Sequence, residues 1–413
     1  MERCVLLLRR KPSATVLRSD NHPQPNPIIP NLDNPVIPGL TGDLQNMIKT
    51  EYYKDLTKMN TFGMKVKARC FIEYDSVADL VDIEFEELAR PVLHIGGGSN
   101  LLFTDDFKGT VLHSKINFIE ILDECHWSTD DTSSEDGRSA ETVLVSVGAG
   151  VVFDDFCDWA AKEGLWGVEN LSYIPGEVGA SAVQNIGAYG VEVKDVIRKV
   201  YCYDTLEEEF VNFDVQECEY GYRDSVFKDP EVKGRYIVTH VVFALSRKPQ
   251  PKLDYGHLKE AVVAAEQEKL AQVTPALIRK VIIKIRKEKL PEPSVMGSAG
   301  SFFKNPVISM EHFHRIEAAA KAEHGADYKV PHYIVPGEGQ SILVKVPAAW
   351  LIEQCGWKGR RSGGAAVWDK QPLVIVNYTG EAYPEEIIGL ERRIIASVKS
   401  KFDIELHPEV DHI

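Results

Sequence analysis

The segment Gly297–Pro306 places Ser301 among small residues, followed by two aromatic residues, a cation and an amide. No histidine or aspartate lies close to Ser301 in the sequence to make it a hydrolase nucleophile. The glycines around it suggest that the backbone approaches a ligand closely. Ser301 could therefore donate a proton or a hydrogen bond to an anionic group that Lys304 helps to bind. The alternative is a glycine-rich turn that leads into a core strand.

Two other glycine-rich segments could bind a cofactor through their backbones. Gly96–Asn100 follows an expected strand, and N–H groups next to glycines bind oxyanions. It is neither a Rossmann nor a Walker loop, because the G-x-G-x-x-G spacing fails at Leu101 and G-K-[ST] is absent. Ile174–Gly190 has neither helical nor strand periodicity, so we expect a long loop that wraps a flat ligand. A plain turn and a structural loop are the alternatives, but together the two segments suggest a cofactor with a pyrophosphate and a ring system.

Apolar periodicity predicts the elements that must position these loops. We expect order to begin near Asn60, with strands at 65–72, 91–95, 143–147 and 404–406. Capping residues and first-turn prolines predict helices that begin after Ser76, at Phe153, at Pro275, after Pro347 and at Pro384. The apolar faces expected for the helices after Ser76, at Pro275 and at Pro384 are Val77, Leu80, Val81 and Leu88; Ile278, Val281, Ile282 and Ile285; and Ile387, Leu390, Ile394 and Val398.

Composition limits the function classes. The chain has 413 residues, 44% hydrophobic and 26% charged, which predicts a soluble protein of two or three domains without a membrane span. A net charge of -15 argues against a general nucleic-acid binder. Seven scattered cysteines without a C-x-x-C motif indicate free thiols in a reducing compartment. We expect no metal site, and we assign His312 and His314 to a helix surface.

Two segments differ in composition from the rest. The first fifty residues or so begin with several arginines and continue as a proline-rich stretch. We expect a disordered extension or a cleaved organellar presequence. Residues 123–142 are acidic and polar, and we expect a solvated loop between two strands.

Further segments, together with the glycine loops, resemble the UDP-N-acetylenolpyruvoylglucosamine reductase (UDP-N-acetylmuramate dehydrogenase) family. They are Asn60–Gly63, Gly221–Ser225, Gly297–Pro306 and Pro408–Val410. Leu253–Gly256 resembles the tyrosine loop of one subclass. The resemblance extends from about Asn60 to Val410.

The resemblance implies an α+β fold, with a two-part FAD-binding domain of the vanillyl-alcohol oxidase (PCMH) type and a C-terminal α/β substrate domain. The boundaries that we expect are an extension at 1–56, a first FAD-binding subdomain at 57–119 with 404–413, a second at 120–290, and a substrate domain at 291–403.

The resemblance also implies a reaction, in which NADPH and FAD reduce UDP-N-acetylglucosamine enolpyruvate to UDP-N-acetylmuramate for peptidoglycan synthesis. Ser301 would be the proton donor, and Arg223 and Glu409 would surround the substrate carboxylate. An FAD-dependent oxidase of the same cofactor fold, or a flavin- or nucleotide-sugar-binding protein without turnover, are the alternatives. We expect a cytoplasmic monomer, with an organelle as the alternative location.

Residues at matching positions are expected to bind the ligands. For FAD these are Gly96, Gly97, Gly98, Ser99, Asn100, Pro175, Gly176, Gly179, Ala180, Asn185, Gly187 and Ala188. For the UDP-sugar they are Tyr189, Tyr222, Tyr255, Lys289, Lys304, Asn305 and Gln354.

The sequence departs from the family pattern after Pro408–Val410. The family continues with a basic residue and a further apolar strand, whereas this sequence continues with Asp411, His412 and Ile413. We therefore expect the strand that carries Glu409 to be anchored on one side only.

Overall fold

The computed structural model describes residues 48–122, 141–269, 273–337 and 341–413. The expectation of a disordered extension or presequence therefore falls mostly outside the described residues, as does almost all of the acidic loop at 123–142.

The first sheet carries one of the glycine loops. Its strand order is β1 (Lys49–Asp55), β2 (Lys67–Tyr74), β5 (Phe107–Ser114) and β3 (Val92–Ile95), and only the β1–β2 pair is antiparallel. Order thus begins earlier than expected, because β1 lies within the segment assigned to the extension and pairs with β2.

Helix α1 (Val77–Val81) begins at the predicted cap but is shorter than the predicted helix. The Ser76 side chain accepts a hydrogen bond from the Asp79 backbone N–H, as expected for a cap. The helix ends after five residues, and Val81 is 45% exposed rather than part of the buried face.

The second sheet is antiparallel, in the order β11 (Glu209–Asp214), β10 (Ile197–Asp204), β12 (Tyr236–Ser246), β7 (Thr142–Gly148) and β6 (Ile119–Ile121). The described residues of this part include the helices α2 (Phe153–Lys162), α3 (Val178–Gln184), α4 (Leu258–Lys269) and α5 (Pro275–Lys289). Helix α5 begins at the expected Thr274 cap and buries Ile278, Val281 and Ile282. A short hairpin of β8 (Gly187–Ala188) and β9 (Val191–Glu192) follows α3.

Helix α3 corrects the expectation of a long loop at Ile174–Gly190. Its seven residues are too small and too few to produce a clear apolar period. Gly179 is close to Ala149, so the small residues let the helix pack tightly on the chain after β7.

The C-terminal part combines two small sheets with three helices. One sheet has the order β13 (Gly297–Ser298), β19 (Ile375–Asn377), β18 (Ala365–Val367) and β17 (Arg361–Ser362), and the other has the order β14 (Val307–Ser309), β16 (Ile342–Lys345) and β15 (Tyr333–Pro336). The helices are α6 (Met310–His324), α7 (Ala348–Gln354) and α8 (Pro384–Phe402). The predicted inner face of α8 is confirmed, since Ile387, Leu390, Ile394 and Val398 are all fully buried. Short 3₁₀ helices elsewhere lie at Thr57–Met59, Phe85–Glu87, Glu169–Leu171, Val193–Asp195 and Val226–Lys228.

The C-terminal segment returns to the chain that follows the first glycine loop, where it forms a separate two-stranded sheet. Residues 404–406 do not form the predicted strand; instead β20 (Asp411–His412) pairs in parallel with β4 (Leu101–Leu102). On the other side, the Glu409 N–H donates to the Phe302 carbonyl over 2.8 Å. The expectation of one-sided anchoring is therefore wrong, because backbone hydrogen bonds hold this segment on both sides.

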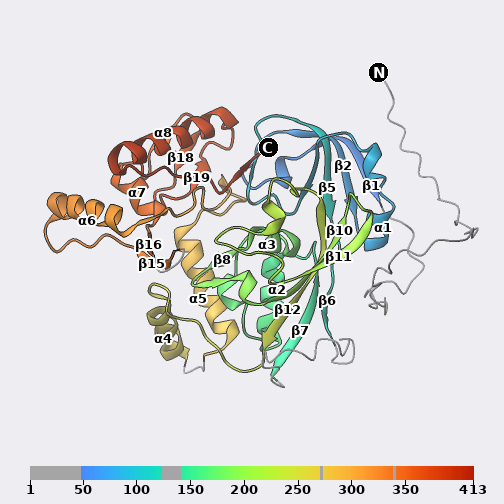
Figure 1. Ribbon diagram of the computed structural model, residues 1–413, viewed down its shortest axis with the longest axis horizontal. Helices are drawn as coiled ribbons and strands as arrows, with labels where there is room; N and C mark the ends of the chain where they lie inside the picture. Colours follow the sequence, from blue (N-terminus) through green and yellow to red (C-terminus); the bar gives the residue numbers. More distant parts are fainter. Residues whose placement is uncertain (1–47, 123–140, 270–272, 338–340) are drawn as a thin grey trace, which may run out of the picture.

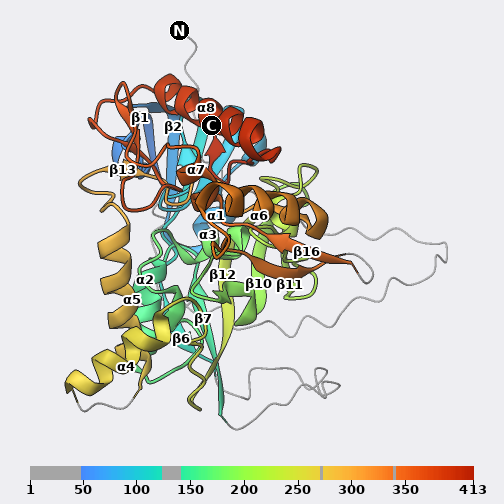
Figure 2. The ribbon, with the colours of Figure 1, turned by 90° about the vertical axis from the view of Figure 1, so that its left-hand side faces the viewer.

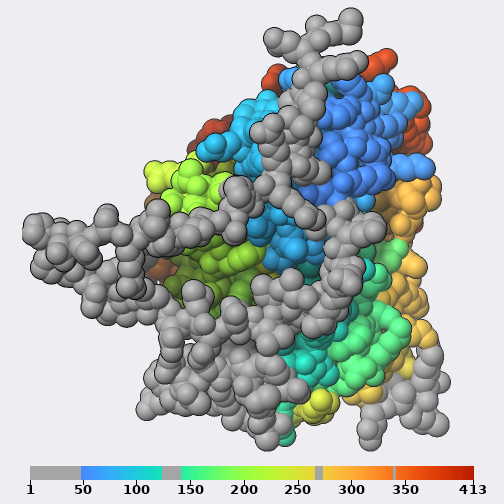
Figure 3. Space-filling model, turned by 90° about the vertical axis from the view of Figure 1, so that its right-hand side faces the viewer, coloured from blue at the N-terminus to red at the C-terminus, as the bar shows by residue number. Residues whose placement is uncertain are grey.

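The three parts are packed around one another. In Figure 1 the first sheet and α8 lie at the top, with the second sheet and its helices below, and Figure 2 shows α5 running along the edge from the upper part toward α4. Figure 3, from another side, shows the first sheet in blue directly against the second part in green. Phe302 and Phe303 share a buried cluster with Leu102 and Phe103, so the serine segment rests on the core of the first sheet. Within the described ranges, no helix combines the length and apolarity that crossing a bilayer requires.

Gly98→Ala should destabilise the fold more than Gly63→Ala. Both glycines have positive φ, +59° and +67°, but a Cβ on Gly98 would lie 1.9 Å from the Met59 carbonyl oxygen, whereas nothing lies within 4 Å of one on Gly63. We expect about 1–2 kcal/mol for the left-handed conformation in either variant and about 2 kcal/mol more for the clash in Gly98→Ala. Urea unfolding of both variants measures the difference, and equal losses would contradict the steric argument.

Candidate active site

The two predicted glycine loops lie against one another. The Ser99 hydroxyl donates to the Pro175 carbonyl over 3.0 Å. A Cβ on Gly97 would lie 3.3 Å from the Gly176 Cα, and a Cβ on Gly96 would lie 3.2 Å from Ala180. The two loops thus pack so closely that a side chain at Gly96 or Gly97 would be crowded, and the backbone stays accessible to a ligand only because these residues are glycines. Such a backbone fits the pyrophosphate of a dinucleotide cofactor.

The two asparagines predicted for the cofactor site use their side chains to connect segments. Asn100 donates from Nδ2 to the Glu409 carbonyl over 3.0 Å. Asn185 is fully buried in a left-handed conformation and donates from Nδ2 to the Gly221 carbonyl over 2.7 Å. Both side chains therefore position neighbouring site residues as well as the loops to which they belong.

Arg223 is held in one orientation by three contacts. It has a φ of +56° in a tight turn that is closed by reciprocal backbone bonds between Gly221 and Asp224. Its Nε lies 3.0 Å from a carboxylate oxygen of Glu409. Its two terminal nitrogens donate to the carbonyls of Asn185 and Gly187 over 3.3 and 2.5 Å. Since arginine has five N–H groups, two remain for a ligand carboxylate.

Glu409 is a largely buried acid, with 15% of its side chain exposed. Burial raises the pKa of its carboxyl group, while the charges of Arg223, Lys228 and Lys304 act against that rise. A carboxyl group in this setting can hold a proton more readily than an exposed glutamate, which suits polarisation of a developing negative charge.

Ser301 lies beside this pair. Its side chain is exposed and follows Gly300, which has a φ of +67°. The next residue, Phe302, accepts the Glu409 N–H, so the backbone brings Ser301 to within one residue of the acid. The structure thus pairs Arg223 with Glu409 and brings the segment of Ser301 against the segment of Glu409.

Tyr222 connects Arg223 to the C-terminal part. Its hydroxyl accepts a hydrogen bond from Asn305 Nδ2 over 3.3 Å, and the Asn305 Oδ1 accepts the Ala348 N–H over 2.9 Å at the start of α7. The ammonium group of Lys345 lies 3.8 Å from the centre of the Tyr222 ring. Burial lowers the pKa of Lys345.

Lys345 and Lys228 are site residues that the sequence interpretation missed. Lys228 donates to the Gln184 side chain and to the Arg223 carbonyl, over 2.9 and 3.1 Å. Lys345 directly follows three apolar residues of a strand, and this position could have identified it as a candidate site residue. Lys228 gave no comparable signal, because a lysine in a polar loop is usually solvated.

The predicted tyrosine loop contacts both the segment after α3 and the C-terminal part. The Tyr255 ring makes an edge contact with Tyr189, with centroids 6.0 Å apart, and stacks on Tyr333 of β15 at 6.2 Å. Tyr333 is thus a further residue next to the predicted substrate group that the sequence interpretation did not identify.

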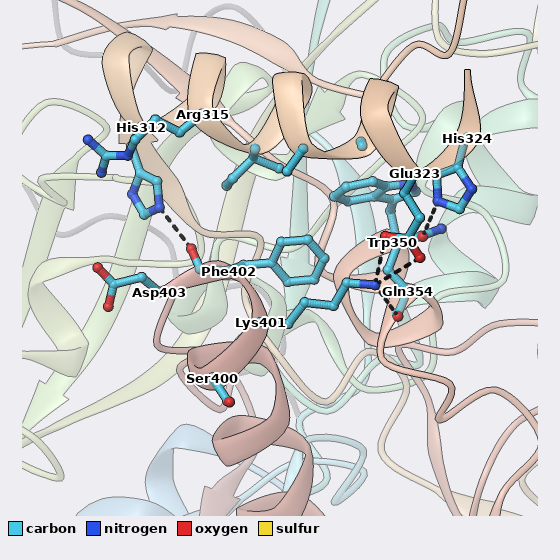
Figure 4. A pocket seen from close by; sticks show the side chains of 13 residues that line it. His312, Arg315, Glu323, His324, Trp350, Gln354, Ser400, Lys401, Phe402 and Asp403 are labelled. Carbon is cyan, nitrogen blue, oxygen red and sulfur yellow. Dashed lines mark hydrogen bonds and ion pairs between the residues drawn. The ribbon is translucent and has the colours of Figure 1, made fainter. Parts of the chain in front are cut away.

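Two predicted substrate residues lie elsewhere. Lys289 is exposed at the end of α5, where its carbonyl accepts the Trp368 indole N–H. Gln354 Oε1 accepts a hydrogen bond from His324 Nε2 over 3.0 Å, and Gln354 lines a separate cavity of about 280 Å³ between α6, α7 and the end of α8 (Figure 4). Within the described ranges, no direct contact joins either residue to Arg223 or Tyr222. His312, at the other end of that cavity, contacts the Phe402 carbonyl at 2.8 Å, and the described residues include no cluster of three or more potential metal ligands.

Taken together, the site combines a fixed guanidinium group, a buried acid, an exposed hydroxyl and two further amines beside two closely packed glycine loops. It could bind a carboxylate with Arg223, stabilise negative charge next to that carboxylate, and deliver a proton from Ser301.

Comparison with known proteins gives a consistent result. Residues 292–413 match the family described as UDP-N-acetylenolpyruvoylglucosamine reductase, C-terminal domain, and residues 68–208 match an FAD binding domain. The UDP-N-acetylenolpyruvoylglucosamine reductase of Bacteroides fragilis (strain YCH46) is 49% identical over 359 residues, covering 87% of this chain and 98% of the relative. The enzyme of the same name from Porphyromonas gingivalis (strain ATCC BAA-308 / W83) is 42% identical over 363 residues, covering 87% and 97%.

A solved structure supports the fold. The UDP-N-acetylenolpyruvylglucosamine reductase of Thermus caldophilus superimposes with a TM-score of 0.55 at 22% identity, covering 89% of this chain and 99% of that one. With the two family matches, this confirms the predicted fold class of an FAD-binding domain of PCMH type followed by a C-terminal substrate domain. The boundaries 57–119 with 404–413, 120–290 and 291–403 stay predictions.

Asn305→Ala should cost more stability than Tyr222→Phe. Tyr222→Phe removes only the hydrogen bond between the two side chains, whereas Asn305→Ala also removes the acceptor for the Ala348 N–H. Loss of an acceptor at a helix start costs about 1 kcal/mol. Urea unfolding of the two variants should differ by about that amount. Equal losses would show that Asn305 does not anchor α7.

Proposed function

This chain belongs to the UDP-N-acetylenolpyruvoylglucosamine reductase family, and we propose that it reduces UDP-N-acetylglucosamine enolpyruvate to UDP-N-acetylmuramate with NADPH as the electron donor. The predictions of the family, of FAD as cofactor and of an oxidoreductase are confirmed by these matches. The observation that carries the proposed reaction is the Arg223–Glu409 pair, held at 3.0 Å beside the segment of Ser301.

The glycine loops fit the cofactor that the family implies. Gly96, Gly97 and Gly176 form a backbone surface on which a Cβ would be crowded, and Ser99 holds the two loops together. FAD, when bound there, supplies the hydride that the vinyl carbon of the substrate receives.

The protein then has two tasks, which are to stabilise negative charge and to deliver a proton. Arg223 binds and orients the substrate carboxylate with its remaining N–H groups, and its charge favours an enolate-like form of that group. Glu409 orients Arg223 and, when protonated, polarises the same charge. Ser301 donates its proton to the strongly basic carbon that results, and regains one from solvent afterwards.

The UDP-sugar would be bound by the charged and polar side chains around Tyr222 and Tyr255. Lys345 and Lys304 supply positive charge suited to a diphosphate, while Tyr222 and Asn305 supply polar contacts. Tyr255, between Tyr189 and Tyr333, would cover the ligand. Lys289 and Gln354 stay predicted ligands of the UDP-sugar.

The visible spectrum of the purified protein and its consumption of NADPH test the proposal. We expect bound oxidised flavin, and NADPH oxidation that depends on the enolpyruvyl UDP-sugar. Peroxide production without NADPH consumption would favour an oxidase of the same cofactor fold. FAD and UDP-sugar binding without any NADPH oxidation would favour a binding protein.

Ser301→Ala should separate the two half-reactions. Reduction of the flavin by NADPH should stay near the wild-type rate, and reoxidation by the enol ether should slow by roughly 10²–10⁴-fold, the usual range for loss of a general acid. Stopped-flow absorbance of the flavin measures both rates. Ser294→Ala, at an exposed serine just before the segment, is the matched control and should behave as the wild type. Equal slowing of both half-reactions by Ser301→Ala would assign Ser301 to folding or cofactor binding instead.

A further inference from the structure

A buried histidine lies between two carboxylates behind the cofactor loops. His113, on β5, is 3% exposed. Its Nδ1 lies 3.0 Å from Oε2 of Glu73 on β2, and its Nε2 lies 3.0 Å from Oε1 of Glu177. With an acceptor at each nitrogen, both nitrogens donate only when the ring is protonated. The geometry therefore favours an imidazolium ion.

The surrounding groups favour the same state. Burial alone lowers the pKa of His113, but hydrogen bonds and charge from Glu177 and Glu73 outweigh that effect and raise the pKa above its ordinary value. Lys115 acts in the opposite direction. The neighbouring His94 stays neutral, because burial, together with the smaller effect of the charge of His113, lowers its pKa to about 3.

Other titratable groups near this cluster lie on the neighbouring strands β1, β2 and β3. Tyr74 of β2 shares a 2.8 Å hydrogen bond with His94 of β3. Burial raises the pKa of Tyr74, which keeps its hydroxyl neutral at physiological pH. On β1, the pKa of Lys49 is raised, mainly by Glu51 and also by the charge of Glu73. The acid nearest to the loops, Glu177, thus has His113 as its hydrogen-bonded cation.

Glu177 belongs to the cofactor loop itself. It follows Gly176 and precedes α3, and its backbone forms a bridge with Val152. Its other oxygen, Oε2, would lie 3.2 Å from a Cβ on Gly96. This carboxylate therefore belongs to one glycine loop and lies next to Gly96 of the other, where the pyrophosphate is proposed to bind. An uncompensated negative charge there would repel the phosphates of FAD.

We propose that His113 is a positioning residue for FAD, which in its protonated form neutralises Glu177 behind Gly96 and so makes the affinity for FAD dependent on pH. The proposal rests on the part of the proposed function that assigns FAD to the glycine loops. It needs no contact between His113 and the cofactor, because Glu177 connects the two.

The direction of the pH effect follows from linkage. Below its raised pKa, His113 is charged and the Glu177 charge is compensated. As the pH rises through that pKa, the proton is lost, Glu177 keeps its charge, and FAD binds more weakly. By reciprocity, bound FAD should raise the pKa of His113 further. An interaction worth one pKa unit changes the dissociation constant tenfold.

Dissociation of FAD from the full-length holoenzyme, measured by ultrafiltration and flavin absorbance from roughly pH 6 to pH 9, tests the proposal. We expect the dissociation constant of the wild type to rise by roughly tenfold over this range. Glu177→Gln, which keeps the shape and removes the charge, should bind FAD with little dependence on pH. Glu86→Gln removes one charge from an exposed site and should retain the wild-type dependence. His113→Gln should weaken binding at low pH, and addition of Glu177→Gln should restore it.

A wild-type dissociation constant that stays constant with pH would overturn the proposal, as would an unchanged pH dependence in Glu177→Gln. If Glu177→Gln loses its far-UV circular dichroism, the ring proton shifts of His113 in the wild type give a second measurement. Those shifts should report a higher pKa with FAD than without it, and identical titrations would overturn the proposal. A purified wild type that takes up no FAD at any pH would contradict the proposed function instead.

Discussion

The contact between Arg223 and Glu409 is the constraint on which the rest of the site depends. A largely buried ion pair loses hydration, so it persists only where other hydrogen bonds hold both partners. Here the carbonyls of Asn185 and Gly187 hold the guanidinium group, and the backbone of Phe302 and the side chain of Asn100 hold the segment of the acid. The cofactor loop, the arginine turn, the serine segment and the C-terminal segment are thereby assembled at one place.

The aromatic core supports this assembly from below. Phe302 is fully buried and makes an edge contact with Phe62, with ring centroids 6.2 Å apart, and a tilted contact with Phe303 at 5.2 Å. Since Ser301 precedes two side chains that are fixed in the core, its backbone has little freedom. An exposed hydroxyl on a rigid support is suited to repeated proton delivery, because its position does not need to be recovered in each turnover.

Local signals in the sequence predicted the elements with strong periodicity or clear caps, such as α5, α8 and the cap at Ser76. They failed where small residues remove periodicity, as in α3, and where pairing with a distant segment decides the structure, as for β1 and β20. Family motifs predicted Arg223, Ser301 and Glu409 as a group; the structure pairs Arg223 with Glu409, and the role of Ser301 stays a prediction. Lys345 and Tyr333 were missed, since only the tertiary fold places β15 and β16 against Tyr222 and Tyr255.

Asn100 has a consequence for the protein without its cofactor. The residue follows the three glycines, its side chain holds the carbonyl of Glu409, and its own carbonyl accepts the Asp411 N–H over 3.0 Å. Any rearrangement of this loop on emptying would therefore shift the acid as well. The loop and the C-terminal segment are therefore coupled, so that ordering of one would also order the other.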